Sequence, residues 1–173
     1  MSAGRKNNSQ IKNWNTPPKI IAAVKDFWNG EIELDPCSNE FSMVGAKRNF
    51  LWPQDGLLED WNASSVFCNP PYGRDSERKT SLLDWAKKSI AANKVFGAEV
   101  ILLIPVATNT RHFKELFNYG GAICFLADTR LKFWMEGRED KKGAPMGCCL
   151  VYVGDRVEEF LGVFGHLGKC VVI

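Results

Sequence analysis

Hydrophobic and polar positions along the chain follow two spacings, one typical of helices and one typical of strands. Apolar side chains three and four residues apart predict a helix over 17–28, with Thr16 as its cap and Pro17 at its first position. A second helix is predicted to begin at Ser81, because Ser81 and Asp84 form a capping-box pattern, and to run to about residue 94. The same spacing predicts helices over 110–118 and 157–164.

Continuous apolar runs predict the strands. The run over 99–106 is almost entirely apolar, which is typical of a strand in a parallel sheet covered on both faces. Shorter runs predict further strands, at 31–34, 46–52, 65–68, 121–127, 130–134, 148–153 and 169–173. Because strands and helices alternate, we predict an α/β fold with a doubly wound, mostly parallel sheet and helices on both faces. The last strands lie close together in the sequence and are expected to form an antiparallel edge.

The length of 173 residues is that of one domain. Residues 1–12 are polar and are expected to form a flexible N-terminus, so the single domain is predicted over 13–173. Within it, the polar segments 73–80 and 135–147 are typical of loops that contact a substrate. The longest apolar run is too short to cross a bilayer, and no signal peptide opens the chain. We therefore expect a cytoplasmic protein without a membrane partner.

Cysteine and histidine usage argues against a metal site. The six cysteines are scattered, none forms a C-x-x-C pair, and only His112 and His166 could add imidazole. We therefore expect buried, reduced thiols and no metal. The net charge of +2 does not by itself require a nucleic-acid partner. Cationic side chains nevertheless gather in the two polar loops, where they can attract phosphate: Arg74, Arg78 and Lys79 in the first, and Arg138, Lys141 and Lys142 in the second.

The stretch Asn69-Pro70-Pro71-Tyr72 follows the predicted strand 65–68. Its two prolines end the strand and make a stiff arm at the carboxyl end, where open α/β sheets bind their ligands. The Asn69 side-chain oxygen and the Pro70 carbonyl are two acceptors, and Tyr72 adds an aromatic face. This set suits a planar ring that carries an exocyclic amino group. The alternatives are a plain proline-rich turn, or a polyproline ligand for a small partner domain.

Two aspartates follow the first two predicted strands. Asp35 comes directly after 31–34, and Asp55 lies in an acidic turn after 46–52. A carboxylate at the end of a first strand can hold the charged or hydroxylated parts of a nucleoside cofactor. The dipeptide Asp35-Pro36 can equally be only a turn.

In combination, these segments resemble the phage-type DNA N6-adenine methyltransferases, a branch of the amino-methyltransferases that use S-adenosyl-L-methionine (AdoMet). The matching segments follow the family's order: Trp14-Asn15-Thr16-Pro17-Pro18, Leu34-Asp35-Pro36-Cys37-Ser38, Asn69-Pro70-Pro71-Tyr72 with Trp85 at the expected distance, Leu103-Ile104-Pro105, and Arg130-Leu131-Lys132-Phe133. The G-x-G of the wider superfamily is absent after the first strand.

The resemblance implies a Rossmann-like AdoMet methyltransferase fold, and methyl transfer from AdoMet to the amine of a flipped adenine in duplex DNA. It implies that catalysis depends on Asn69, Pro70, Pro71 and Tyr72. Cofactor contacts are expected from Trp14, Thr16, Pro17, Asp35, Pro36, Cys37, Ser38, Asp55 and Asn69, and DNA contacts from the six cationic residues of the two loops. Alternatives are the same transfer to RNA or to a protein glutamine amide, and a non-catalytic DNA-binding module that keeps the fold. Monomer and homodimer both remain open.

Overall fold

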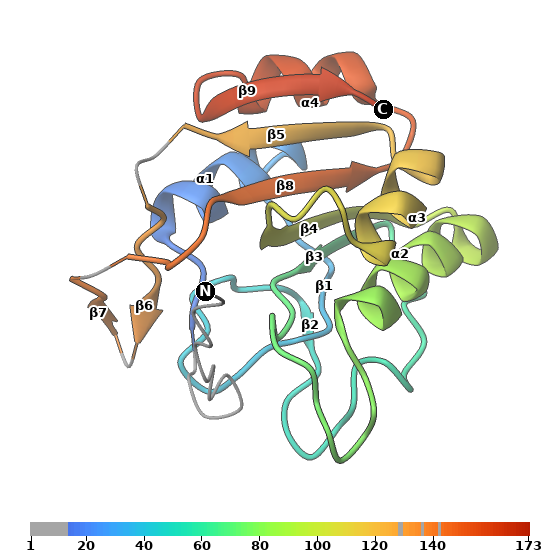
Figure 1. The fold of residues 1–173 in the computed structure, drawn as a ribbon, viewed down its shortest axis with the longest axis vertical. Coiled ribbons are helices and arrows are strands. Elements are labelled where there is room, and N and C mark those ends of the chain that lie inside the picture. Colours follow the sequence, from blue (N-terminus) through green and yellow to red (C-terminus); the bar gives the residue numbers. More distant parts are fainter. Residues whose placement is uncertain (1–13, 128–129, 136, 142) are drawn as a thin grey trace.

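The computed structural model describes residues 14–127, 130–135, 137–141 and 143–173. The predicted flexible terminus, 1–12, and Lys142 lie outside the described residues. In the part of the chain that is described, helices pack on a seven-stranded sheet (Figure 1). The helices are α1 Pro18–Phe27, α2 Leu82–Phe96, α3 Arg111–Tyr119 and α4 Val157–Phe164. The sheet contains β1 Leu34–Asp35, β2 Arg48–Asn49, β3 Ser65–Cys68, β4 Glu99–Pro105, β5 Ala122–Leu126, β8 Cys148–Val153 and β9 Gly168–Val172, and a separate hairpin contains β6 Trp134–Met135 and β7 Arg138–Glu139.

The sheet is mixed, with the strand order β2-β1-β3-β4-β8-β5-β9. The first four strands of this order are parallel to one another. β8 then pairs antiparallel with both β4 and β5, and β9 pairs antiparallel with β5. The predicted antiparallel strands are therefore present, but they reach the interior of the sheet beside β4 instead of forming only its edge.

Helices cover both faces of the sheet. Phe27 of α1 packs with Phe160 and Phe164 of α4 in one buried cluster, which also contains Ile101 and Leu103 of β4. A second cluster joins α2 and α3 to the intervening residues of β4. Successive side chains of a strand point to opposite faces, so one apolar strand supplies both clusters. No helix of the described residues is long and apolar enough to cross a membrane.

Several predicted boundaries are confirmed. The strands at 65–68 and 148–153 and the helix at 157–164 form as expected. The capping box of α2 is present, because the Asp84 carboxylate accepts hydrogen bonds from the backbone N–H and the hydroxyl of Ser81, at 2.8 and 3.0 Å. This capping box fixes the residue at which the loop after β3 ends and α2 begins.

Other predicted boundaries are wrong. Thr16 does not cap α1: the N-cap is Pro17, the helix begins at Pro18, and no side chain caps it. The strand expected over 130–134 forms only at its end, where Trp134–Met135 pairs with Arg138–Glu139 and Trp134 also bridges to Asn15. The apolar pattern there comes from core burial of Leu131 and Phe133, not from a ladder. Of the strand expected over 46–52, only Arg48–Asn49 pairs.

Candidate active site

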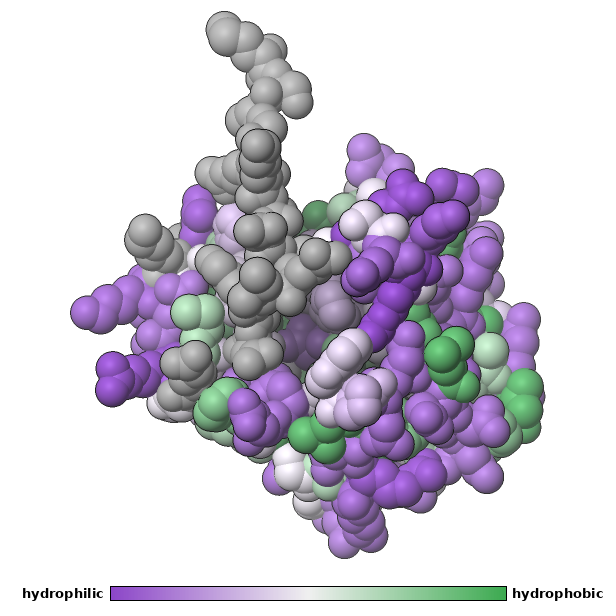
Figure 2. Space-filling view, turned by 90° about the horizontal axis from the view of Figure 1, so that it is seen from below, coloured by the Kyte–Doolittle hydropathy of each residue, from purple (hydrophilic) through white to green (hydrophobic). Residues whose placement is uncertain are grey.

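A cleft of about 500 Å³ opens beside the carboxyl end of β3. Its lining comes from Trp14, from the loop after β1, from the turn after β2, and from the segment between β3 and the first turns of α2. In the view from below, the molecular surface is hollowed near its centre, and the described residues beside the hollow are mostly hydrophilic (Figure 2). This volume is within the range of small-molecule sites, about 300–1,000 Å³.

Asn69 is the first residue beyond β3, and it lines the cleft. Its Nδ2 donates a hydrogen bond of 3.1 Å to the backbone carbonyl oxygen of Trp14. A carbonyl oxygen can only accept, so the amide atom that faces Trp14 must be the nitrogen. No donor from the described residues occupies the other end of the amide. Asn69 therefore has its Oδ1 available as an acceptor for a ligand.

Tyr72 presents an aromatic ring to the cleft. Its ring lies edge-to-face with Trp14 and Phe133, at centroid distances of 6.4 and 5.9 Å, and Trp14 stacks on Phe133 at 5.2 Å. The hydroxyl is the buried end of the side chain. Burial raises the pKa of Tyr72 well above its ordinary value, so the phenol stays neutral. The residue is suited to stacking and not to proton transfer.

The segment before α1 is attached to the site through backbone pairing. The Asn15 N–H donates to the Trp134 carbonyl at 2.8 Å, and the Trp134 N–H donates back at 3.0 Å. The Asn39 amide also donates to the Asn15 side-chain oxygen at 2.8 Å. Of the expected cofactor residues in this segment, Trp14 lines the cleft, whereas Thr16 and Pro17 are buried and do not.

Asp35 is buried, with 3% of its surface exposed, and is not among the lining residues. Its Oδ1 accepts the Cys37 N–H at 3.1 Å, and its Oδ2 accepts the Ser42 hydroxyl at 3.3 Å. Burial raises the pKa of Asp35 to about 6, and these hydrogen bonds limit the rise. The hydrogen bond from Cys37 N–H to the Asp35 side chain defines an Asx turn, so Asp35 does form the turn that was one of its two predicted roles. Contact between Asp35 and a cofactor stays a prediction.

The loop that Asp35 organises does reach the cleft. Cys37 and Ser38 line it, while Pro36 is buried and does not. Burial raises the pKa of the Cys37 thiol far above neutral, so the thiol is protonated and cannot act as a nucleophile. No cluster of ligating side chains that could hold a metal ion occurs in the described part of the chain.

Asp55 lines the cleft, and each of its two carboxylate oxygens has a partner. Its Oδ1 accepts the Leu57 N–H at 3.1 Å, and its Oδ2 lies 3.3 Å from an Arg78 nitrogen. Gly56 allows this position, because a Cβ there would overlap the backbone carbonyl oxygen of Pro36. The Gly56 carbonyl in turn accepts the indole N–H of buried Trp61 at 2.7 Å. The turn after β2 and the loop after β1 are thereby held in direct contact.

The predicted loop 73–80 forms one wall of the cleft. Asp75 and Thr80 pair their backbones, and Asp75 also accepts the N–H groups of Glu77 and Arg78. Arg74 and Arg78 line the cleft, whereas Lys79 does not. The described cations of the second loop, Arg138 and Lys141, are exposed and also lie outside the lining.

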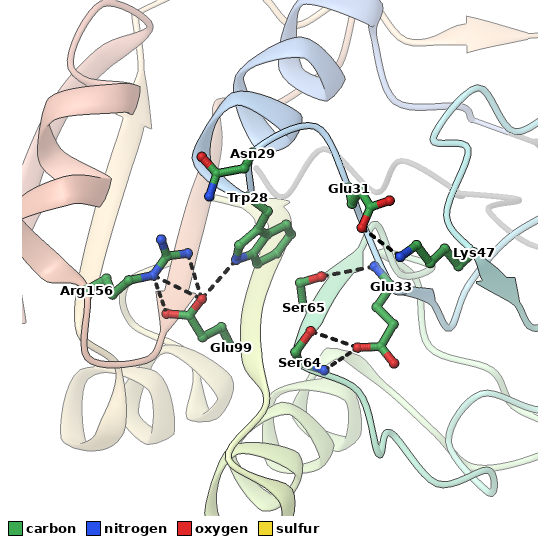
Figure 3. A pocket seen from close by; sticks show the side chains of 9 residues that line it. All are labelled: Trp28, Asn29, Glu31, Glu33, Lys47, Ser64, Ser65, Glu99 and Arg156. Atoms are coloured by element: carbon green, nitrogen blue, oxygen red, sulfur yellow. Dashed lines mark hydrogen bonds and ion pairs between the residues drawn. The ribbon is translucent and has the colours of Figure 1, made fainter.

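A second cavity, of about 320 Å³, lies at the opposite ends of the parallel strands, beside the first residues of β3 and β4 (Figure 3). Its charged groups already have partners: Glu99 pairs with Arg156 at 2.8 Å, Glu31 pairs with Lys47 at 2.6 Å, and Glu33 accepts the backbone N–H of Ser64 at 2.6 Å. Because these groups already satisfy each other, the cavity is best explained as a structural junction. The chemistry-bearing residues gather in the first cleft.

A comparison with protein families shows to which family the chain belongs. The model of the DNA N-6-adenine-methyltransferase (Dam) family matches residues 4–164. The chain belongs to the Dam family. A search among curated proteins gave no match. The family model spans the cleft and both predicted loops, so the resemblance drawn from the sequence segments is confirmed.

Several lining residues of this Dam-family cleft were not expected from the sequence. They are Asn39, Trp52, Leu57 and Ser81, whereas Gly73, Asp75, Glu77 and Thr80 belong to the predicted substrate-contacting loop 73–80. Trp52 was assigned to a strand, yet it lies beyond β2 in a turn and is 79% exposed. A tryptophan directly before Pro53 in an acidic turn was the signal that could have placed it at a loop tip. Trp85 is buried against Trp61, and it also lines the cleft.

Proposed function

We propose that this Dam-family chain transfers a methyl group from AdoMet to N6 of an adenine flipped out of duplex DNA. The orientation of Asn69 is the observation that supports this most strongly. Its nitrogen is committed to Trp14, so its oxygen is directed to accept from a ligand. An adenine amino group has two protons to donate, and the Pro70 carbonyl is the second acceptor on the same arm.

These two acceptors would act on the nucleophile. Adenine N6 is a weak nucleophile, because its lone pair is delocalised into the ring. Hydrogen bonds from its protons to Asn69 Oδ1 and the Pro70 carbonyl would favour a pyramidal nitrogen and free the lone pair. In-line positioning would contribute much of the remaining acceleration. When N6 bonds to the methyl carbon, the bond from that carbon to the sulfonium sulfur would break, leaving a neutral thioether, and N6 would release one proton to water, so no strong base would be required.

The cleft residues fit AdoMet. Asp55 and Ser38 offer oxygen atoms for hydroxyl or ammonium groups, Leu57 is apolar, and Trp14 adds an aromatic surface. An ionised Asp35 close to the loop would also favour a cation. When bound, AdoMet supplies the methyl group, which its sulfonium makes electrophilic. We assign its binding to this loop, to Asp55 and to Trp14, within a doubly wound, Rossmann-like fold.

Flipping the target base out of the duplex costs a few kcal/mol. Stacking on the Tyr72 ring would offset about 1–3 kcal/mol of this cost. Phosphate contacts from Arg74, Arg78 and the second loop would supply the rest, because cationic side chains release counterions from DNA. This assigns base binding to the arm after β3 and backbone binding to the two loops.

The test is Asn69→Ala, with the exposed α3 residue Asn118→Ala as a matched control. Losing one preorganised hydrogen bond at a transition state costs about 3–4 kcal/mol, so turnover on unmethylated duplex DNA should fall by about two to three orders of magnitude. AdoMet affinity, measured by calorimetry, should stay within about threefold of wild type. Turnover of Asn69→Ala close to that of Asn118→Ala would refute the role of Asn69.

A further inference from the structure

Trp52 is a large aromatic side chain left in solvent at the rim of the cleft. It is 79% exposed and is among the lining residues. By contrast, Trp28, Trp61 and Trp85 are each less than one-tenth exposed. Single exposed apolar residues are common on proteins, so exposure by itself carries no conclusion. What distinguishes Trp52 is its position at the cleft and the cation beside its ring.

That cation is Arg78. Its guanidinium carbon lies 5.2 Å from the centroid of the Trp52 ring. Nitrogens of the same guanidinium lie 3.3 Å from Asp55 and 3.9 Å from Asp75. The two carboxylates therefore hold Arg78 through Nη1 and Nε, while Nη2 has no partner among the described residues and most of the indole surface remains open. A fixed cation next to an open aromatic face matches the two parts of a nucleotide, because phosphate pairs with guanidinium and a base stacks on the ring.

We propose that Trp52 stacks on a nucleobase of the DNA substrate at the entrance of the cleft, while Arg78 meets the adjoining phosphate. This inference rests on the proposed methylation of DNA and adds to it a base contact outside the Asn69 arm. The high exposure of Trp52 favours a large partner that covers the rim over a small ligand held inside. The adenine of AdoMet offers the same ring chemistry, so the experiment must separate the two sources.

The experiment compares Trp52→Ala, Trp52→Phe and Leu58→Ala. Leu58 is 82% exposed on the same segment between β2 and β3 and does not line the cleft, so its variant is the matched control. Binding is measured with unmethylated duplex DNA over a series of salt concentrations, and separately with AdoMet alone. Trp52→Ala should weaken DNA binding by about tenfold, and Trp52→Phe by no more than about threefold, because it keeps a stacking ring. Leu58→Ala should bind like wild type.

Two further readouts identify the cause. The slope of log affinity against log salt should be unchanged in Trp52→Ala, because the indole neutralises no phosphate. AdoMet affinity in the absence of DNA should also be unchanged. Wild-type DNA affinity in Trp52→Ala would overturn the proposal, and so would a loss of AdoMet affinity, which would assign the ring to the cofactor. Failure of the wild type to methylate any DNA would instead overturn the proposed function.

Discussion

Asp35→Asn offers a test of how the loop after β1 is built. The introduced amide would keep the shape of the side chain, an acceptor for the Cys37 N–H and a partner for the Ser42 hydroxyl. It removes the titration and turns the atom that accepts from Ser42 into a donor, to which the Ser42 hydroxyl oxygen can respond by accepting. Burial raises the pKa of Asp35 from an ordinary 3.8 to about 6, so between these values the folded state holds a proton that the unfolded state has released. Stability must therefore fall as the pH rises through this window, in total by about 3 kcal/mol.

The measurement is urea unfolding of wild type and Asp35→Asn at a series of values from about pH 4 to about pH 7. The free energy of unfolding of wild type should decline relative to the variant as the pH rises, and the difference should level off above about pH 6. A difference that does not change with pH would show that Asp35 ionises normally, and would refute the burial argument. In wild type, AdoMet affinity should also rise with pH through about 6, if the cofactor's positive charge lies near this carboxylate.

Three further predictions use other parts of the structure. Gly56→Ala should weaken AdoMet binding in calorimetry by at least about tenfold, since its Cβ would overlap the Pro36 carbonyl, whereas Gly162→Ala, with open space around it, should bind normally. Glu99→Gln should lower the free energy of unfolding by about 2 kcal/mol, because Arg156, Tyr152 and Trp28 all donate to that carboxylate, yet turnover on DNA should persist because this junction lies away from the cleft. Joint replacement of Arg138 and Lys141 by alanine should reduce the slope of log affinity against log salt by about 2, and an unchanged slope would exclude both from phosphate contact.

Local signals predicted much of this molecule. The apolar run of β3 and the prolines after it placed the Asn69 arm at a strand end, and the Ser81–Asp84 pattern placed the start of α2. Each of these signals acts over a few residues. The orientation of the Asn69 amide could not be predicted in this way, because it depends on a carbonyl 55 residues away in the sequence.

The errors have the same origin. The apolar residues Leu131 and Phe133 suit either a strand or a loop anchored in the core. They form a loop here, in which Phe133 is buried and stacks on Trp14. Tryptophan is common in strands, but β2 ends at Asn49. Trp52 therefore lies beyond the strand, exposed to solvent at the cleft. Asp35 suited a turn and a ligand site equally, and the hydrogen bond to Cys37 shows the turn without testing the ligand. Tertiary packing determines these conformations, and local sequence propensity cannot predict them.

The central proposal is that the Asn69 arm methylates adenine N6 in DNA. Its most direct test is incubation of the wild-type protein with methyl-labelled AdoMet and unmethylated duplex DNA, followed by digestion to nucleosides and separation of the products. We expect the label in N6-methyldeoxyadenosine, and its loss in Asn69→Ala. Label in another nucleoside, label only in RNA or protein offered alongside the DNA, or no transfer by a folded protein that binds AdoMet would contradict the proposal.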